Sequence, residues 1–178
     1  MKTILSITDK DITGSSKLSP AKPRIAVGAV LFDCDNNIAL SYIGNWGIYT
    51  LPGGGVDDGE DFLTAVKREM REETGCDCEI TGEIGTTYQN SAEEEFVMEK
   101  HHYIAKVVGE KGELNLEEYE IASGTTVRWY PLEQALQAIS EQAISERAHE
   151  IIRYSEFQRR RDIAVLEEVI RLKIKIQN

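Results

Sequence analysis

The stretch LPGGGVDDGEDFLTAVKREMREETGC, residues 51–76, decides the fold of this chain. It opens with the run Gly53-Gly54-Gly55, and because glycine has no Cβ atom, such a run suits unusual backbone angles or the close approach of another group. From Asp61 to Thr74 there are good helix formers, no proline and apolar residues at helical spacing, and Gly75 follows as a stop signal. We therefore predict a loop that leads into a helix over 61–74, with the functional site beginning at the glycine run.

Three carboxylates share one face of this predicted helix. Glu69, Glu72 and Glu73 stand at i, i+3 and i+4, so their side chains project together. Like charges at this spacing weaken a helix unless cations neutralise them, and hard divalent ions such as Mg²⁺ prefer oxygen ligands. The ordinary alternative is a solvated helix face, offset by the basic residues of the same helix. The adjacent glycine run favours a site for metal and phosphate instead.

The same stretch resembles the Nudix box, in which glycine, glutamate, Arg-Glu, an aliphatic residue, Glu-Glu and glycine recur at fixed spacing. The positions that match are Gly54, Glu60, Arg68, Glu69, Met70, Glu72, Glu73 and Gly75. Cys76 replaces the usual aliphatic residue at the last position, and we expect it to do the same packing job. The lead-in from Tyr49 to Gly54 is similar to the family's aromatic-x-Leu-Pro-Gly-Gly, and the resemblance covers roughly residues 24–139.

The resemblance implies an α/β fold, namely an α/β/α sandwich around a mixed β-sheet, and from the sequence beyond it we expect one or more extra C-terminal helices. It implies that Glu69, Glu72 and Glu73 hold Mg²⁺, for which Mn²⁺ can substitute, and that the Gly53 carbonyl is a candidate further ligand. By the same resemblance we expect Arg68 to be a catalytic residue as well. The family pairs this arginine with a box glutamate, so that it orients a ligand carboxylate. Structural or supporting roles within the box fall to Gly54, Glu60 and Gly75.

The implied reaction is hydrolysis of a pyrophosphate bond in a nucleoside diphosphate linked to another group, giving a nucleoside monophosphate and the phosphorylated remainder. Bound metal neutralises the phosphate oxygens and lowers the pKa of the attacking water. The family places the general base either on the box helix, where Glu69 is a candidate for both roles, or on a later loop glutamate. Glu117, Glu118 and Glu120 lie in such a later segment, but no spacing singles one out, and solvated loop charge explains each of them.

The substrate is less constrained than the reaction. Trp46 and Tyr49 precede the box, where a nucleotide base can stack on them or where they pack in the core. The sequence lacks the signatures that the family uses for ADP-ribose, dinucleoside polyphosphates and NADH. Asn90-Ser91-Ala92 stands where the proline of the ADP-ribose signature would lie, downstream of the box. A nucleoside triphosphate, or an oxidised or otherwise modified nucleotide, remains the expected small-molecule substrate.

Composition and charge fit a cytoplasmic enzyme of one domain. The 178 residues carry a formal net charge of -11, which argues against binding a nucleic-acid duplex but is compatible with a cation between protein and phosphates. Three cysteines give no disulfide framework, and we expect neither a signal peptide nor a membrane span. Residues 1–23 are expected to be an N-terminal strand and linker of the same domain, and residues 24–178 the Nudix hydrolase domain with its helical extension.

Further strands and helices are predicted around the box. Strands are expected over 24–32, 38–43, 79–88, 96–108 and 125–130, the first two forming a hairpin. Pro131 starts a helix over 132–139, and Ser155-Glu156-Phe157-Gln158 has the form of a capping box before a long helix that ends near Lys175. The apolar stripe of that helix packs on its own domain or on a second copy of the chain, so a monomer and a homodimer both stay open.

Two other functions use the same fold. A non-catalytic nucleotide or ADP-ribose sensor is the main alternative, but the intact ligand set argues against it, and this acidic chain provides no DNA-binding domain of the kind that such regulators carry. Isopentenyl diphosphate isomerase chemistry expects catalytic Cys and Glu at other locations. The complete box therefore favours hydrolysis.

Overall fold

The computed structural model describes residues 1–142 and 149–173, with side chains for all of these except 149–154. A seven-stranded mixed sheet forms its centre, in the order β1-β5-β6-β2-β3-β4, with β7 paired to β3. The strands are β1 Thr3–Thr8, β2 Arg24–Phe32, β3 Asn37–Ile43, β4 Ile48–Thr50, β5 Asp77–Ser91, β6 Phe96–Val108 and β7 Thr125–Pro131. The helices are α1 Asp9–Ile12, α2 Phe62–Thr74, α3 Glu118–Ala122, α4 Leu132–Glu141 and α5 His149–Arg171.

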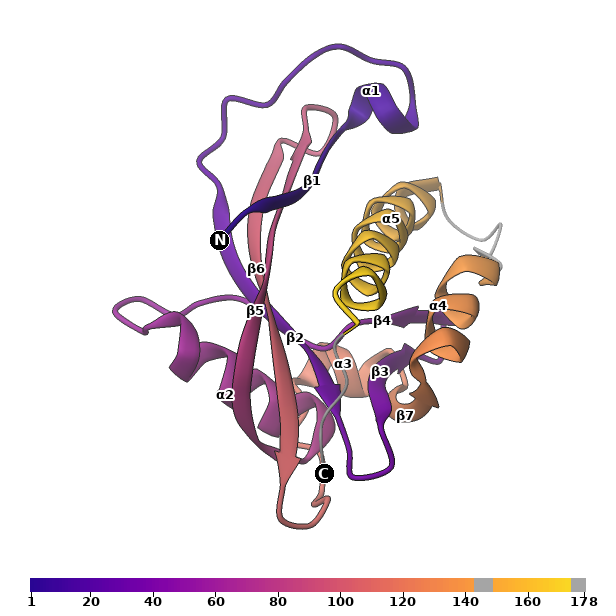
Figure 1. The fold of residues 1–178 in the computed structure, drawn as a ribbon. Helices are drawn as coiled ribbons and strands as arrows, with labels where there is room; N and C mark the ends of the chain where they lie inside the picture. Colours follow the sequence, from indigo (N-terminus) through magenta and orange to yellow (C-terminus); the bar gives the residue numbers. More distant parts are fainter. Residues whose placement is uncertain (143–148, 174–178) are drawn as a thin grey trace.

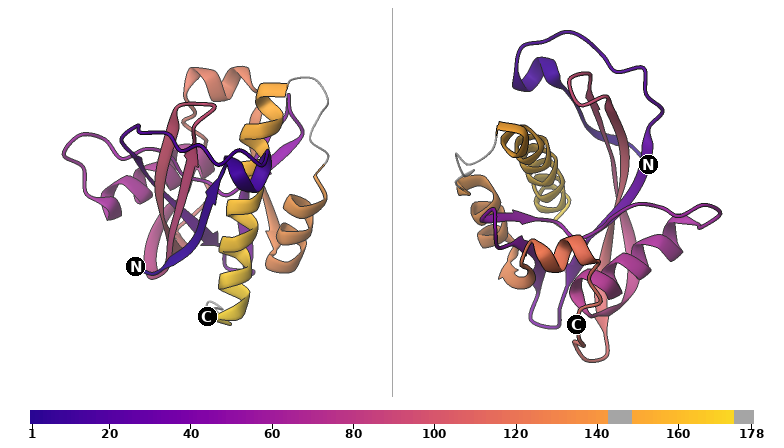
Figure 2. Two further views of the ribbon diagram at one scale, coloured as in Figure 1. Left: turned by 90° about the horizontal axis from the view of Figure 1, so that it is seen from above. Right: turned by 180° about the vertical axis from the view of Figure 1, so that it is seen from behind.

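Helices cover both faces of this sheet (Figure 1). On one face α2 packs against β2 and β5, and its Val66 and Met70 belong to a buried core together with Cys76, as expected for the last box position. On the other face a second core contains Leu166 and Val169 of α5. The views in Figure 2 show α5 running between α4 and the part of the sheet formed by β1, β5 and β6. The predicted α/β/α sandwich around a mixed sheet is confirmed.

β2 and β3 are joined by the predicted turn, but they pair only next to it and then diverge. The Asp33 carboxylate holds the turn by accepting the backbone N–H groups of Asp35 and Asn37 at 3.0 and 2.9 Å. Antiparallel pairing between the two strands is limited to Phe32 and Ile38, whereas β2 pairs along its length with β6 in parallel. β3 turns away to pair with β4 and β7. The remaining edge of β2 is therefore left without a strand partner on that side.

Most predicted elements are present, with small shifts at their ends. The box helix is α2, which is capped by the Asp61 carboxylate and closed by Gly75 in the left-handed conformation at φ 70°. Two short helices depart from the prediction. One is α1, in the expected N-terminal linker, and the other is α3, where Glu117 and Glu120 form a capping box within the acidic segment.

The long C-terminal helix begins earlier than predicted. Ser155 lies inside α5 instead of at its start, so the prediction from the capping-box pattern is wrong. Residues 149–154 contain neither glycine nor proline, so nothing stops the helix from starting upstream, and Ser155 is fully buried within it. The helix ends at Arg171, and Lys175, near which its end was expected, lies outside the described residues.

The apolar stripe of α5 packs on the chain's own sheet. Val165, Leu166 and Val169 are fully buried against residues of β2, β3 and α4, and Ile163 lies at the margin of this core. Of the two partners that the sequence leaves open for this stripe, the structure shows the first. No helix in the described part of the chain is long and apolar enough to cross a membrane.

Truncating Leu166 should therefore cost much stability. We expect Leu166→Ala to lower the free energy of unfolding by about 2–5 kcal/mol, because a fully buried leucine leaves a cavity in a packed core. Leu172→Ala is the matched control, since Leu172 is 42% exposed just beyond the same helix. Urea denaturation followed by circular dichroism measures both variants. Equal losses in the two would contradict the packing of α5 described here.

Candidate active site

The glycine loop that follows β4 is seated on the free edge of β2. The backbone N–H of Val27 donates to the Gly54 carbonyl at 2.9 Å, and that of Ala29 donates to the Pro52 carbonyl at 3.3 Å. Gly53 has φ +136°, and a methyl group on it would lie 2.3 Å from the Val27 carbonyl oxygen. Only glycine fits this close approach, which is what the glycine run predicts.

α5 braces the chain just before this loop through a fully buried carboxylate, Asp162. Its Oδ2 accepts the Thr50 hydroxyl at 2.8 Å and the backbone N–H of Leu51 at 3.0 Å. The Thr50 hydroxyl in turn accepts Nε2 of Gln158 at 2.8 Å. Nε of Arg161 donates to Asp162 Oδ1 at 3.1 Å, so the buried negative charge has a cationic partner. The C-terminal helix thereby fixes the strand end that leads into the glycine loop.

The box gathers its carboxylates around one cavity of about 220 Å³. Gly53, Glu69, Glu72 and Glu73 all line this cavity. Glu69 is only 8% exposed, and a methyl group on Gly54 would lie 2.6 Å from both of its carboxylate oxygens. Glycine at position 54 thus makes room for the Glu69 carboxylate. The four residues that the sequence analysis nominates as metal ligands lie side by side.

Burial perturbs two of these carboxyl groups. Glu73 Oε2 accepts the Ser41 hydroxyl at 2.9 Å and the Gly53 N–H at 3.2 Å. Burial raises the pKa of Glu73 to about 8, against the opposing effects of Lys100 and Ser41. Burial also raises the pKa of Glu69, against the opposing effect of the Arg68 guanidinium. Such carboxyl groups in a cleft mark a candidate functional site, because a bound cation would favour their ionised forms.

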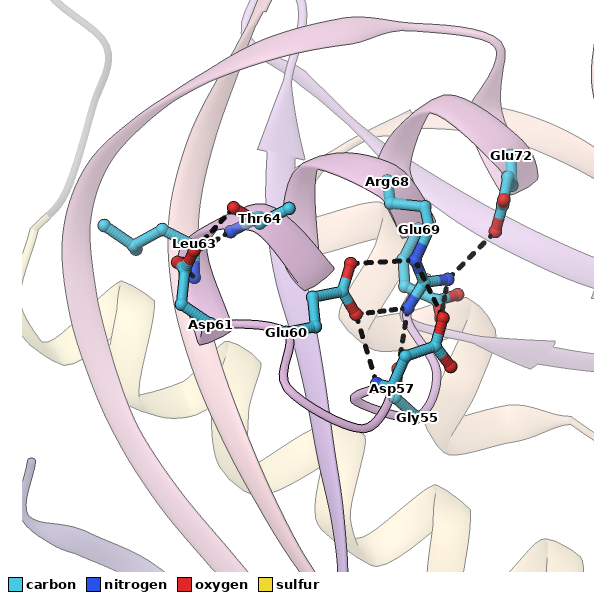
Figure 3. Close-up of polar contacts among 9 residues, drawn as sticks. All are labelled: Gly55, Asp57, Glu60, Asp61, Leu63, Thr64, Arg68, Glu69 and Glu72. Carbon is cyan, nitrogen blue, oxygen red and sulfur yellow. Dashed lines mark hydrogen bonds and ion pairs between the residues drawn. The ribbon is translucent and has the colours of Figure 1, made fainter.

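Arg68 ties the loop and the helix together (Figure 3). Its Nε and Nη2 donate to the two oxygens of Glu60 at 3.0 and 2.9 Å, and these bonds raise the pKa of Arg68 above its ordinary value. Nη1 donates to Glu69 at 2.8 Å and to Glu72 at 3.1 Å, while Nη2 also donates to the Gly55 carbonyl at 2.9 Å. One guanidinium therefore orients two of the three box carboxylates.

The donor set suits a hard divalent cation. Among the described residues no three His, Cys, Asp or Glu side chains already surround one point. However, Arg68 binds one oxygen each of Glu69 and Glu72, and one oxygen of Glu73 accepts both of its hydrogen bonds. Each carboxylate keeps a second oxygen that accepts no hydrogen bond from the described side chains. Carboxylate and carbonyl oxygens are the ligands that Mg²⁺ accepts, so these residues fit the ion.

A larger cavity of about 320 Å³ adjoins the carboxylates. Both cavities are lined by Gly53, Glu73, Tyr119 and Glu120. The larger one also has apolar and neutral polar walls, formed by Ser41, Ile43, Trp46, Thr50, Leu51, Ser123, Thr125 and Gln158. Of the two aromatic residues that precede the box, Trp46 thus lines the larger cavity. Tyr49 is outside the described lining of both cavities and packs against Tyr42 and Tyr130, with ring centroids 4.8 and 5.8 Å apart.

Several lining residues are not nominated by the sequence. Arg24 and Ser41 come from β2 and β3, which carry no motif. Tyr119 and Glu120 come from α3, and Glu120 is the one glutamate of the acidic segment that lines both cavities. Burial raises the pKa of Glu120. The capping-box pattern from Glu117 to Glu120 is the sequence signal that could have placed a helix here and separated these glutamates from one another.

A family model for the NUDIX domain matches residues 22–153 of this chain. The chain belongs to the Nudix hydrolase family. The RNA pyrophosphohydrolase of Caulobacter vibrioides (strain NA1000 / CB15N) is 31% identical to this Nudix hydrolase over 144 residues, which cover 70% of this chain and 81% of that protein. Nudix hydrolase 10 of Arabidopsis thaliana is 39% identical over 60 residues, and this match covers 34% of this chain but only 22% of that protein's length.

Solved structures agree on the fold of this Nudix hydrolase. The MutT NUDIX hydrolase from Burkholderia pseudomallei has a TM-score of 0.52 and 22% identity, with coverage of 78% of this chain and 98% of that one. The Ap4A hydrolase of C. elegans has a TM-score of 0.53 and 19% identity, with coverage of 86% and 100%. At these identities the likeness concerns the fold alone.

Proposed function

We propose that this Nudix hydrolase uses Mg²⁺ to hydrolyse a pyrophosphate bond in a nucleoside diphosphate derivative, giving a nucleoside monophosphate and the phosphorylated remainder. Nucleoside triphosphates and modified nucleotides are the first candidate substrates. The observation that carries the proposal is the convergence of Gly53, Glu69, Glu72 and Glu73 on one cavity, which shares part of its lining with a second, larger one. The names of relatives such as the Caulobacter RNA pyrophosphohydrolase support this reaction class.

The three box carboxylates and the Gly53 carbonyl would hold the metal, and Mn²⁺ could take the place of Mg²⁺. When bound, the ion would neutralise phosphate oxygens and lower the pKa of water. Arg68 would keep Glu69 and Glu72 in orientation, because its Nη1 donates to both. Ser41 of β3 would do the same for Glu73, because its hydroxyl donates to one oxygen of that carboxylate. Each ligand carboxylate thus has a partner that limits its rotation.

Proton transfer from the attacking water has two candidate acceptors. Glu69 lies on the box helix with one oxygen held by Arg68. Glu120 lies on α3, lines both cavities, and is not tied to Arg68 by any contact among the described residues. We favour Glu120, because an acceptor that is not also engaged by a guanidinium is the stronger base.

The larger cavity would take the nucleoside. Its volume of about 320 Å³ lies at the lower end of the range for small-molecule pockets. Trp46 and Tyr119 supply aromatic faces, while Ser123 and Thr125 supply hydroxyl groups. A base stacked there would place its phosphates toward Gly53 and Glu73, which belong to both cavities.

Glu73→Gln should abolish turnover. Loss of a ligand carboxylate should lower kcat by more than about 100-fold, because even partners one step removed from a metal typically contribute 10- to 100-fold. Phosphate or pyrophosphate release is measured on a panel of nucleoside triphosphates, ADP-ribose, dinucleoside polyphosphates and nucleotide sugars, with Mg²⁺ and with chelator. Glu118→Gln is the control, because Glu118 is exposed and lines neither cavity. Tight binding of one compound without turnover by the unmodified protein would support the sensor instead.

Glu120→Gln tests the proposed proton acceptor. We expect kcat to fall by about 10²- to 10⁴-fold, the usual contribution of a general base, while the metal requirement and KM stay close to those of the unmodified protein. The pH profile distinguishes this role from a packing role, because the acidic limb of the kcat profile should disappear. An unchanged limb would return the assignment to Glu69.

Trp46→Ala tests the nucleoside cavity. Loss of one stacking contact worth roughly 1–3 kcal/mol should raise KM by about 5- to 150-fold with a smaller change in kcat. Trp46→Phe keeps an aromatic face and should recover most of the affinity. Steady-state kinetics on the best substrate of the panel measure both variants. Equal KM values for the alanine and phenylalanine variants would place the base elsewhere.

A further inference from the structure

A buried lysine lies behind the carboxylate cavity and belongs to no motif. Lys100 is on β6, where it pairs with Ala26 of β2 and Thr87 of β5, and only 4% of it is exposed. A lysine is rarely buried without a partner, because desolvating its ammonium group is costly. Its position therefore needs an explanation beyond packing.

The fold provides a passage for this side chain. A methyl group on Gly28 would lie 2.7 Å from Cε and 3.1 Å from Nζ of Lys100, so the side chain crosses β2 where no Cβ stands in its way. Its Nζ then reaches the Gly53 carbonyl oxygen at 3.4 Å. The N–H of the same Gly53 donates to Glu73 at 3.2 Å. A single residue of the loop thus separates the ammonium group from the half-buried Glu73 carboxylate.

Lys100 forms no ion pair with any carboxylate of the described residues. Asp162, the buried acid of α5, already accepts bonds from Arg161, Thr50 and Leu51. Burial and the nearby Arg161 lower the pKa of Lys100. The negative groups that act on it besides Asp162 are Glu73 and Glu69. Its charge thus acts on the two box carboxylates as well as on Asp162, which is already paired with Arg161.

The hydrogen bond to Gly53 is not what holds the loop in place. Its length of 3.4 Å makes it weak, and the loop is already fixed on β2 through the carbonyls of Pro52 and Gly54. Lys100 instead contributes a positive charge close to where a cation would sit, in addition to Arg68, which contacts Glu69 and Glu72 directly, and to Arg24 in the cavity lining. Like charges repel most strongly where water is excluded.

We propose that Lys100 is an internal counter-ion of the box, which balances the carboxylates in the metal-free protein and weakens their intrinsic affinity for a divalent cation. The inference rests on the proposed metal-dependent function. Its consequence is that the cation is held firmly only when it arrives with the negative charge of a phosphate-bearing substrate. Lys100 therefore acts on the metal site through its charge alone, and it contacts neither the substrate nor the reacting atoms.

Direct metal binding tests this inference without any measurement of activity. Isothermal titration of the metal-free protein with Mn²⁺ at pH 7, without nucleotide, should show that Lys100→Met binds the ion about tenfold more tightly or better. Lys100→Arg keeps the charge and should bind as the unmodified protein does. Glu73→Gln is the negative control and should bind more weakly.

Each outcome has a separate meaning. Unchanged or weaker binding by Lys100→Met would overturn the counter-ion role. An equal gain in Lys100→Met and Lys100→Arg would also overturn it, since relief of crowding, not charge, would then be the cause. If Lys100→Met does not fold, Lys100→Gln replaces it in the same comparison with Lys100→Arg. Absence of Mn²⁺ binding by every one of these proteins, Lys100→Met included, would overturn the counter-ion role, whereas turnover that a chelator leaves unchanged would contradict the proposed metal dependence itself.

Discussion

The free edge of β2 is the constraint on which the site depends. Once β3 turns away after Phe32, the N–H groups of Val27 and Ala29 need acceptors, because buried backbone donors are costly to leave unpaired. The carbonyls of Pro52 and Gly54 supply them. Val27 and Ala29 also belong to the core that buries α2, so one strand aligns both the glycine loop and the carboxylate helix. The distance between Gly53 and the box glutamates is set by this shared support.

Local patterns predict the elements of this fold better than their pairing. The box helix and the strands follow from periodicity and stop signals that lie within a dozen residues, and the Asp33 turn follows from its composition. The separation of β2 from β3 is not a local property, because it depends on β6, which lies some sixty residues further along the chain. The capping-box pattern misplaces the start of α5 for the same reason, since it does not reveal that its serine is buried by the rest of the domain.

Some residues of the candidate site can likewise be found from local sequence patterns, whereas others are brought there only by the fold. Glu69, Glu72, Glu73 and their partner Arg68 are found from spacing alone, because they share one helix. Ser41, Lys100 and Asp162 reach the same place from β3, β6 and α5, and the sequence around each of them reads as ordinary strand or helix. Trp46 and Tyr49 are equal candidates in the sequence, yet Trp46 lines the larger cavity while Tyr49 packs among other aromatic residues. Only the three-dimensional packing of the chain distinguishes Trp46 from Tyr49.

The brace formed by Asp162 lies beyond residue 153, where the match to the family model ends. The part of the chain that this protein shares with its family is thus held in shape by a helix that lies mostly outside the shared part. The amide of Leu51 can exchange with solvent only when Asp162 releases it, so undocking of α5 and exposure of the loop belong to one cooperative opening unit. The glycine loop is thus held in place by α5, the last helix of the described chain.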